Sequence, residues 1–207
     1  MARQGVIQNT KGKSVVTPLG EALWVKVIEP DYKFDAKGKY SADIVLDPSD
    51  EGAAKFIKVM EGLRDRALAE AKENLAPAKA KQVVSRDVFW EDTDKEGEPT
   101  GKIVIKTKAN AIDYNEEAVN IPVFNAKGIE EQGWNSLIGN GSKVKLQVWA
   151  SPYHMANGNY VGISYKLKKV QVIELSAYSG GGNEGFGDET GDGFGEEVAA
   201  TATDSDF

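Results

Sequence analysis

The spacing of hydrophobic residues predicts a chain built mainly from β-strands. In residues 23–28 and again in 39–46, apolar side chains occupy every second position, which is the period of a strand with one buried face. The turn-forming residues between these two segments predict a long hairpin. The Asn157-Gly158 pair predicts another tight turn, and a break in the alternation near Lys168-Lys169 predicts a β-bulge. Further strands are expected at 83–90, 102–109, 121–124, 143–150 and 160–175.

One segment has the period of a helix instead. Asp47, Pro48 and Ser49 form a helix-start signal, and the apolar residues that follow recur three and four positions apart until the chain reaches Pro77. Short strands with one inserted amphipathic helix favour a small barrel of the OB-fold type, with a β-sandwich as the alternative. The helix follows the second strand, which is not the usual OB-fold position, so the strand order stays open. A helix over about 49–76 would carry on one face Phe56, Met60, Leu63, Ala67, Ala71 and Leu75.

The composition changes after Leu175. Residues 176–207 hold eight glycines, eight acids and no Lys or Arg. Such a segment cannot bury enough apolar surface to offset the entropy lost on ordering, so we expect it to be disordered. Residues 1–14 are polar and basic and are expected to form a flexible arm. The expected organisation is this arm, an OB-fold domain over 15–175 and an acidic tail over 176–207.

The net charge of −7 conceals two parts of opposite character. Residues 1–175 hold 25 bases and 24 acids, a net charge of +1, and the tail holds the other eight acids. A nearly neutral body joined to an anionic tail is typical of nucleic-acid binding or of an acidic interaction segment.

Residue counts exclude several classes of site. The chain has no cysteine, which excludes disulfides, thiolate metal sites and cysteine nucleophiles, and it has one histidine, His154. We therefore expect no metal, no cofactor and no enzyme activity. No segment is apolar enough for a signal peptide or a membrane span, so a soluble intracellular protein is expected. An acidic run leaves a metal-dependent nuclease as an alternative, although its turn-like spacing favours a solvated loop: Asp92, Asp94, Glu96 and Glu98.

The predicted outward faces of four strands carry lysines, and three of these faces add a large aromatic residue. Lysines neutralise phosphates and release counterions, and aromatic faces stack on unpaired bases, worth roughly 1–3 kcal/mol per base. Single-stranded DNA is the expected ligand, and RNA stays open because stacking does not exclude it. Alternation assigns to the core Leu23, Val25, Val27, Ile103, Ile105, Val144, Leu146, Val148, Ala150, Val161, Ile163, Tyr165 and Leu167. The predicted nucleic-acid-binding residues are Trp24, Lys26, Lys33, Phe34, Lys39, Lys102, Lys106, Lys108, Lys143, Lys145, Trp149, Tyr153, Tyr160, Lys166 and Lys168.

Each of these features also has a structural explanation. Outward lysines on strands commonly serve solubility and protect sheet edges. Trp24 and Trp149 can instead cover a sheet face beneath the helix. A virion or scaffold protein that uses the β-body for assembly is a further alternative. The combination of lysines with aromatics is what favours nucleic acid.

Three stretches resemble the single-stranded DNA-binding proteins of tailed bacteriophages, the helix-destabilising type with an OB-fold. They are Thr17-Pro18-Leu19-Gly20 before the first strand, the hairpin sequence over 139–163, and the acidic tail closing on Phe207. The resemblance implies a protein of the host-cell cytoplasm that coats and protects single strands during phage DNA replication, recombination and repair. It also implies cooperative or dimeric binding, so a homodimer is expected.

The resemblance also implies a role for the tail. In the family the tail recruits replication proteins, such as DNA polymerase and primase-helicase, and occupies the DNA groove when DNA is absent. A tethered anion has a high effective concentration beside a cationic groove, and salt screens the attraction. This tail is more glycine-rich and less densely acidic than the family's pattern. The predicted partner-binding residues are Asp204, Asp206 and Phe207.

Overall fold

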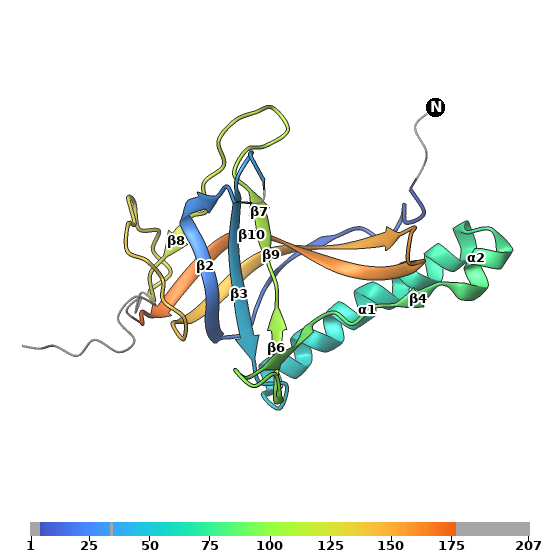
Figure 1. The fold of residues 1–207 in the computed structure, drawn as a ribbon, viewed down its shortest axis with the longest axis horizontal. Coiled ribbons are helices and arrows are strands. Elements are labelled where there is room, and N and C mark those ends of the chain that lie inside the picture. The colour runs from blue at the N-terminus through green and yellow to red at the C-terminus, as the bar shows by residue number, and fades with distance from the viewer. Residues whose placement is uncertain (1–4, 34, 177–207) are drawn as a thin grey trace, which may run out of the picture.

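The computed structural model describes residues 5–33 and 35–176 (Figure 1). The predicted tail apart from Ser176, including Asp204, Asp206 and Phe207, lies outside the described residues, as does Phe34. No helix in the described part is long and apolar enough to cross a membrane. The elements in chain order are β1 (Lys13–Val16), β2 (Gly20–Asp31), β3 (Lys39–Leu46), α1 (Glu51–Asn74), α2 (Pro77–Gln82), β4 (Val84–Ser85), β5 (Trp90–Thr93), β6 (Pro99–Ile105), β7 (Lys108–Asn110), β8 (Val123–Phe124), β9 (Lys143–Met155) and β10 (Tyr160–Glu174).

Five strands close into a barrel. β2 pairs with β3 on one side and with β9 on the other, β3 pairs with β7, β7 with β10, and β10 with β9. All of these pairings are antiparallel except that of β7 with β10. The closed circuit confirms the predicted OB-fold-like barrel over the β-sandwich.

β9 and β10 extend beyond the barrel as a two-stranded hairpin that runs alongside α1 (Figure 1). One face of this hairpin packs on the helix, because Met60 and Leu63 of α1 lie in the same hydrophobic core as Ile163 and Tyr165. The Tyr165 hydroxyl also donates a hydrogen bond of 2.7 Å to the Val88 carbonyl. The opposite face of the hairpin is consequently turned away from the helix.

α1 follows the second barrel strand, the unusual position that the sequence indicated. Its bounds, Glu51–Asn74, agree with the predicted 49–76. Five of the six predicted apolar side chains are buried, and Leu75 is the half-buried residue just after the helix. Pro77 follows the end of α1 as predicted, but it also begins the short helix α2, which the sequence did not predict. Proline suits the first turn of a helix because its missing N–H would have no partner there.

The alternation predicted for the hairpin strands agrees with the structure. The predicted bulge lies between Leu167 and Lys169, and Val170 and Val172 take the buried positions after it. The predicted core residues of β9 and β10 are all buried: Val144, Leu146, Val148, Ala150, Val161, Ile163, Tyr165 and Leu167.

The alternation predicted for β2 is wrong at its start. Ala22 is buried in the core, whereas Leu23 is half-buried on the other side of the strand. The pairing register of β2 with β3 shifts between Leu23 and Lys26, and Trp24 has a φ of 52°. This local irregularity moves the core positions from even to odd numbers, so Val27 is buried as predicted.

Three other predicted strands differ from the observed ones. The segment 102–109 is split into β6 and β7, because Thr107 is fully buried between them and its hydroxyl donates to the Ala42 carbonyl. The segment 83–90, predicted as one strand, contains only β4 and the first residue of β5. The predicted strand over 121–124 is shorter as well and contains only β8. The acidic turn after Trp90 joins β5 to β6 as a hairpin.

The N-terminal residues 5–14 lie against the body, whereas the sequence predicted a flexible arm over 1–14. The backbone N–H groups of Gln8, Asn9 and Thr10 donate to the Glu70 carboxylate of α1 at 2.6, 2.6 and 2.7 Å. These hydrogen bonds, that of Asn9 above all, lower the pKa of Glu70 to about 2. Lys13 and Ser14 belong to β1, which pairs with β9.

Candidate nucleic-acid interface

The outward face of the β9–β10 hairpin carries large aromatic side chains. Trp149 on β9 lies directly opposite Lys166 on β10, and Tyr153 lies opposite Gly162. A Cβ at Gly162 would sit 2.7 Å from the Tyr153 hydroxyl oxygen, so the missing side chain gives the tyrosine room against the β10 backbone. The rings of Tyr153 and Tyr160 meet edge to face with centroids 6.1 Å apart. This face therefore presents aromatic rings that a packed core does not cover.

The segment after β4 adds a cation and further aromatic rings beside this face. The Arg86 N–H donates to the Val161 carbonyl at 2.8 Å, which places the segment along an edge of β10. The Arg86 guanidinium lies 4.4 Å from the centre of the Tyr160 ring, a cation–π contact. A pocket of about 400 Å³ opens here, lined by Arg86, Asp87, Phe89, Trp90, Glu91, Tyr153, Tyr160 and Ile163.

Lysines continue the surface on β7 and on the residues before it. The Lys106 ammonium lies 5.4 Å from the centre of the Trp90 ring, and both Lys106 and Lys108 are exposed. Lys108 is the direct neighbour of Lys166 in the parallel pairing of β7 with β10. Contacts and pairings thus join eight residues into one surface, here named the hairpin face: Arg86, Trp90, Lys106, Lys108, Trp149, Tyr153, Tyr160 and Lys166.

The four cations of the hairpin face make no ion pair with any residue in 5–33 or 35–176. The carboxyl group of Asp43 lies near Lys106 and Lys108 and interacts with both electrostatically. Its pKa is raised, because the effect of burial exceeds the lowering by the Thr107 N–H and by the two lysines. The positive charges are therefore available to an external anion, which is what a polyphosphate ligand requires.

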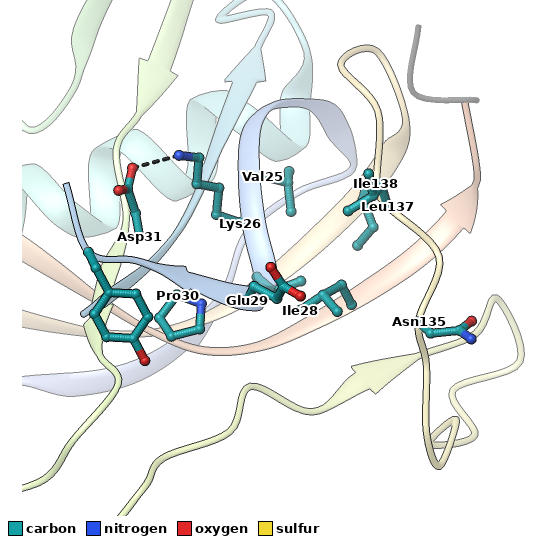
Figure 2. Close-up of a pocket in the computed structure, with 11 residues that line it drawn as sticks. Val25, Lys26, Ile28, Glu29, Pro30, Asp31, Asn135, Leu137 and Ile138 are labelled. Atoms are coloured by element: carbon teal, nitrogen blue, oxygen red, sulfur yellow. Dashed lines mark hydrogen bonds and ion pairs between the residues drawn. The ribbon is translucent and has the colours of Figure 1, made fainter. Parts of the chain in front are cut away.

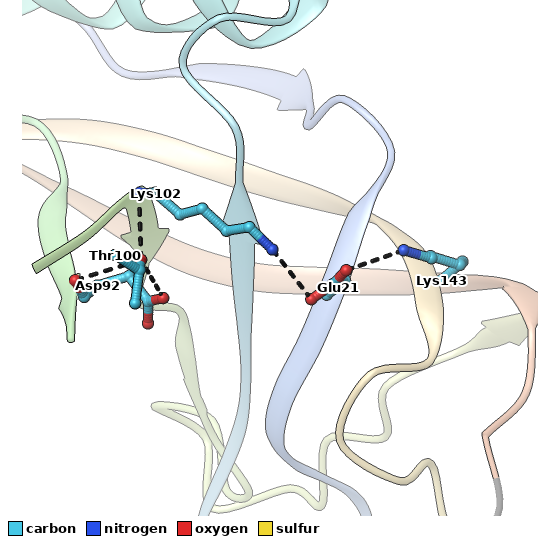
Figure 3. A network of polar contacts seen from close by, with 5 residues as sticks. All are labelled: Glu21, Asp92, Thr100, Lys102 and Lys143. Carbon is cyan, nitrogen blue, oxygen red and sulfur yellow. Dashed lines mark hydrogen bonds and ion pairs between the residues drawn. The ribbon is translucent and has the colours of Figure 1, made fainter. Parts of the chain in front are cut away.

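Other predicted lysines are already held by carboxylates. Lys102 and Lys143 both contact Glu21, at 3.6 and 3.0 Å (Figure 3). The hydrogen bond from Lys143 is the largest of the effects that lower the pKa of Glu21. Exposed ion pairs are worth only about 0–1 kcal/mol, so DNA can compete for these lysines, yet they are less available than those of the hairpin face. Two further predicted lysines are paired as well, Lys26 with Asp31 at 2.6 Å and Lys39 with Asp35 at 3.0 Å.

A second group of predicted residues lies on β2. Trp24 is 66% exposed, and the following residues of β2 line a pocket of about 540 Å³ that faces residues 135–138 (Figure 2). Ser41 on β3 is paired both with Lys26 on β2 and with Lys108 on β7. The predicted residues on β2, Trp24 and Lys26, therefore border the hairpin face and do not lie on a separate side of the barrel.

The remaining predicted residues are more scattered. Lys33 is exposed in the turn after β2, Lys168 is exposed at the bulge of β10, and Lys145 is half-buried on β9. Sequence reasoning missed Arg86 and Trp90, because the segment 83–90 has no regular alternation from which a face could be assigned. A tryptophan and an arginine four residues apart are the signal that this segment did offer.

The chain is similar to proteins of known sequence and of known structure. No protein-family model matches the chain. A 75-residue stretch, 36% of the chain, is 32% identical to a single-stranded DNA-binding protein of Enterobacteria phage T3 and spans 32% of that relative's length. Among solved structures, gp2.5 of bacteriophage T7, a single-stranded DNA-binding protein, matches with a TM-score of 0.64 at 22% identity, covering 87% of this chain and 98% of that one.

The fold is that of bacteriophage single-stranded DNA-binding proteins. The single-stranded DNA-binding protein of bacteriophage Enc34, solved in complex with single-stranded DNA, has the same fold, with a TM-score of 0.53 at 17% identity over 84% of this chain and 96% of that one. The resemblance stated from the sequence is confirmed. The relatives that match are described as single-stranded DNA-binding proteins.

Proposed function

We propose that this protein binds single-stranded DNA without chemical change to it, and that the hairpin face is the principal contact surface. The observation that carries the proposal is that four cations without ion-pair partners among the described residues lie on one face with four aromatic side chains. Its support from relatives is their naming as single-stranded DNA-binding proteins, one of them in complex with that ligand.

The arrangement suits an unpaired strand better than a duplex. Exposed rings stack on bases only when those bases are not already stacked within a helix, and each stacked base contributes roughly 1–3 kcal/mol. Three of the cations on this surface each lie beside an aromatic ring, so phosphates and bases of one strand would meet matching groups. Stacking reads no base edges, which favours binding with little dependence on sequence.

The acidic run that suggested a nuclease has a structural role. The Asp92 carboxylate accepts a hydrogen bond from the Thr100 hydroxyl at 2.7 Å (Figure 3). The Asp94 carboxylate accepts the N–H groups of Glu96 and Glu98 at 3.0 and 2.9 Å. Closing the β5–β6 turn accounts for these carboxylates without a catalytic role.

The finer biological role is a further proposal, which the resemblance and the charge distribution support. We propose that the protein acts in the cytoplasm of the host cell, as a homodimer, in phage DNA replication, recombination and repair. Within the tail, Asp204, Asp206 and Phe207 would recruit replication proteins such as DNA polymerase and primase-helicase. The support for this is the concentration of eight acids without a base in 176–207 and the aromatic residue at position 207.

A fluorescence titration with oligo-dT over a series of salt concentrations tests the DNA-binding proposal. We expect quenching of tryptophan emission, affinity that falls steeply with salt, and much weaker binding to duplex DNA. Replacing three lysines of the hairpin face, Lys106→Gln, Lys108→Gln and Lys166→Gln, removes contacts to about three phosphates. The slope of log affinity against log salt should then fall by about 2, at about 0.7 per phosphate for single strands.

The matched control removes the same number of charges from the helices. Lys58, Lys72 and Lys81 are exposed on α1 and α2, so the triple Gln variant of these lysines should bind like the wild type. The proposal would be contradicted by equal affinity for duplex and single-stranded DNA, or by an equal loss of affinity for oligo-dT in both triple variants.

A further inference from the structure

The outward faces of β9 and β10 continue past Trp149 and past the bulge, toward the barrel. Gln147 is paired with Lys169 of β10 and, on the other side, with Val16 of β1. In the next outward row, Lys145 is paired with Gln171. Since outward residues of one strand lie two positions apart, these rows adjoin the row that holds Trp149 and Lys166. The surface of the proposed DNA site therefore extends without a break along the hairpin.

A small pocket lies at the end of these rows, where β8 joins β10. Its volume is about 220 Å³, and we name it the β8 pocket. This is below the roughly 300–1,000 Å³ of pockets that enclose drug-sized ligands, so it has room for only a part of a larger molecule. Its lining consists of Val16, Phe124, Gly128, Lys145, Gln147, Lys169 and Gln171.

The chemistry of the β8 pocket is cationic and aromatic. The Lys169 ammonium lies 5.2 Å from the centre of the Phe124 ring. Neither Lys145 nor Lys169 makes an ion pair within the described residues. No carboxylate is among the lining residues, although Glu130 forms a backbone bridge with Phe124 nearby. Two cations without ion-pair partners in the described part of the chain, beside an aromatic ring, match one nucleotide with its phosphate and its base.

Hydrogen bonds fix the polar wall of the pocket. The Gln171 side-chain amide donates to the carbonyls of Asn125 and Ala126 at 3.2 and 3.3 Å, which ties β10 to the turn after β8. Phe124 is itself paired with Gln171 in the parallel contact of β8 with β10. The ring is thus held on sheet structure and does not depend on a loose loop for its position.

We propose that the β8 pocket is a second subsite for the same DNA strand, which takes one base against Phe124 and its phosphate on Lys145 and Lys169. The inference rests on the proposed function and deepens it, because it gives the strand a path from the hairpin face along β9. Trp149 and Lys145 are four residues apart, a span of about 13 Å along a strand. Oligonucleotides that cover only the hairpin face would not reach the pocket, whereas longer ones would.

The test compares oligo-dT lengths between about 4 and 16 nucleotides, the range of site sizes for one OB-fold. The variant carries Lys145→Gln and Lys169→Gln. We expect unchanged affinity for the shortest oligonucleotide that binds the wild type. For the longest, the salt slope should fall by about 0.7, because the contact to one phosphate is lost.

A second variant, Phe124→Leu, keeps an apolar side chain on β8 but removes the ring. It should bind long oligo-dT at least about fivefold more weakly, the lower limit of a lost stacking contact, and short oligo-dT normally. Thermal unfolding of each variant checks that the barrel is intact. The control variant, Lys58→Gln with Lys81→Gln, removes two charges from the helices and should match the wild type at every length.

Nuclear magnetic resonance gives a direct readout of occupancy. Long oligo-dT should shift the side-chain amide signals of Gln147 and Gln171, and short oligo-dT should not. Normal binding of all lengths by both pocket variants, with no shift of these signals, would overturn the subsite and leave the pocket to another occupant such as a protein partner. That result would leave the proposed function intact, whereas failure of the wild-type protein to bind any oligo-dT would overturn both.

Discussion

At Trp24, backbone conformation and side-chain exposure both differ from those of an ordinary strand residue. Its φ of 52° lies in the left-handed region, which costs a residue with a side chain roughly 1–2 kcal/mol. The Trp24 N–H donates to the Asn140 side chain at 2.9 Å, and the Trp24 carbonyl accepts from the Ser41 hydroxyl at 3.2 Å. These bonds hold the strained conformation, and the indole is turned outward at the edge of the proposed DNA path. Strain of this kind often accompanies function.

Two substitutions at Trp24 separate the strain from the role of the ring. Trp24→Gly and Trp24→Ala both remove the indole, but only alanine keeps a Cβ at the positive φ. Urea unfolding should show the glycine variant to be more stable than the alanine variant by about 1 kcal/mol. If Trp24 stacks on DNA, both variants should lose the same affinity for oligo-dT. Equal stability of the two variants would show that the left-handed conformation is not kept in solution.

Among the elements, the N-terminal segment is bound to α1 through one carboxylate that accepts several of its backbone N–H groups. Glu70 accepts three consecutive backbone N–H groups, from Gln8, Asn9 and Thr10, and is 8% exposed. A little further along, a Cβ at Gly12 would lie 2.6 Å from the indole nitrogen of Trp149. The segment thus joins the helix on one side of the hairpin to a residue of the hairpin face on the other.

Glu70→Gln should destabilise the protein at neutral pH, because an amide accepts these hydrogen bonds less strongly than a carboxylate. The pKa of Glu70 is lowered from 4.5 to about 2 in the folded state. Its contribution to stability is therefore complete above pH 4.5 and is lost as the pH falls from there through 2. Urea unfolding at several pH values should show the difference in free energy of unfolding between variant and wild type shrinking over this interval.

The control for this experiment is Glu73→Gln, which removes an exposed carboxylate from the same helix. Its stability should follow that of the wild type at every pH. The role assigned to the ionised carboxylate would be contradicted if the difference in free energy of unfolding between Glu70→Gln and wild type stayed the same between pH 7 and pH 3.

The elements were predicted well where local pattern decides them and less well where distant contacts do. Alternation in β9 and β10 is regular, so their core residues and the bulge could be read from the sequence. The shift at Trp24 could not, because a positive φ at tryptophan leaves no mark in the pattern. The hairpin face depends on the pairing of Lys108 with Lys166 and on the contact of Arg86 with Tyr160, both between segments far apart in the chain. For the same reason, the ion pairs that hold Lys102 and Lys143 could not be foreseen.

For the molecule as a whole, the division of charge predicts how the tail affects DNA binding. A chain that ends at Leu175 has a net charge of +1, compared with −7 for the full chain. At low salt the shorter chain should bind oligo-dT more tightly, because the acidic segment no longer competes with DNA for the lysines. The difference should shrink as salt rises, since the screening length falls from about 10 Å at 0.1 M to about 3 Å at 1 M.

Parallel titrations of the two chains measure this effect. The opposite result, weaker binding after truncation at every salt concentration, would mean that residues 176–207 contribute to DNA affinity and do not oppose it.

The closed barrel also has a consequence for the time course of folding. Its circuit is completed where β2 meets β9, and Glu21 and Lys143 at this junction are 122 positions apart in the chain. Contacts between such distant residues form late, because the loop entropy must be lost before the pairing is gained. The edges of β2 and β7 that close the barrel therefore stay unpaired until the residues of β9 and β10 have been synthesised. We expect slow refolding from denaturant, on the millisecond-to-second scale of barrels with many distant pairings.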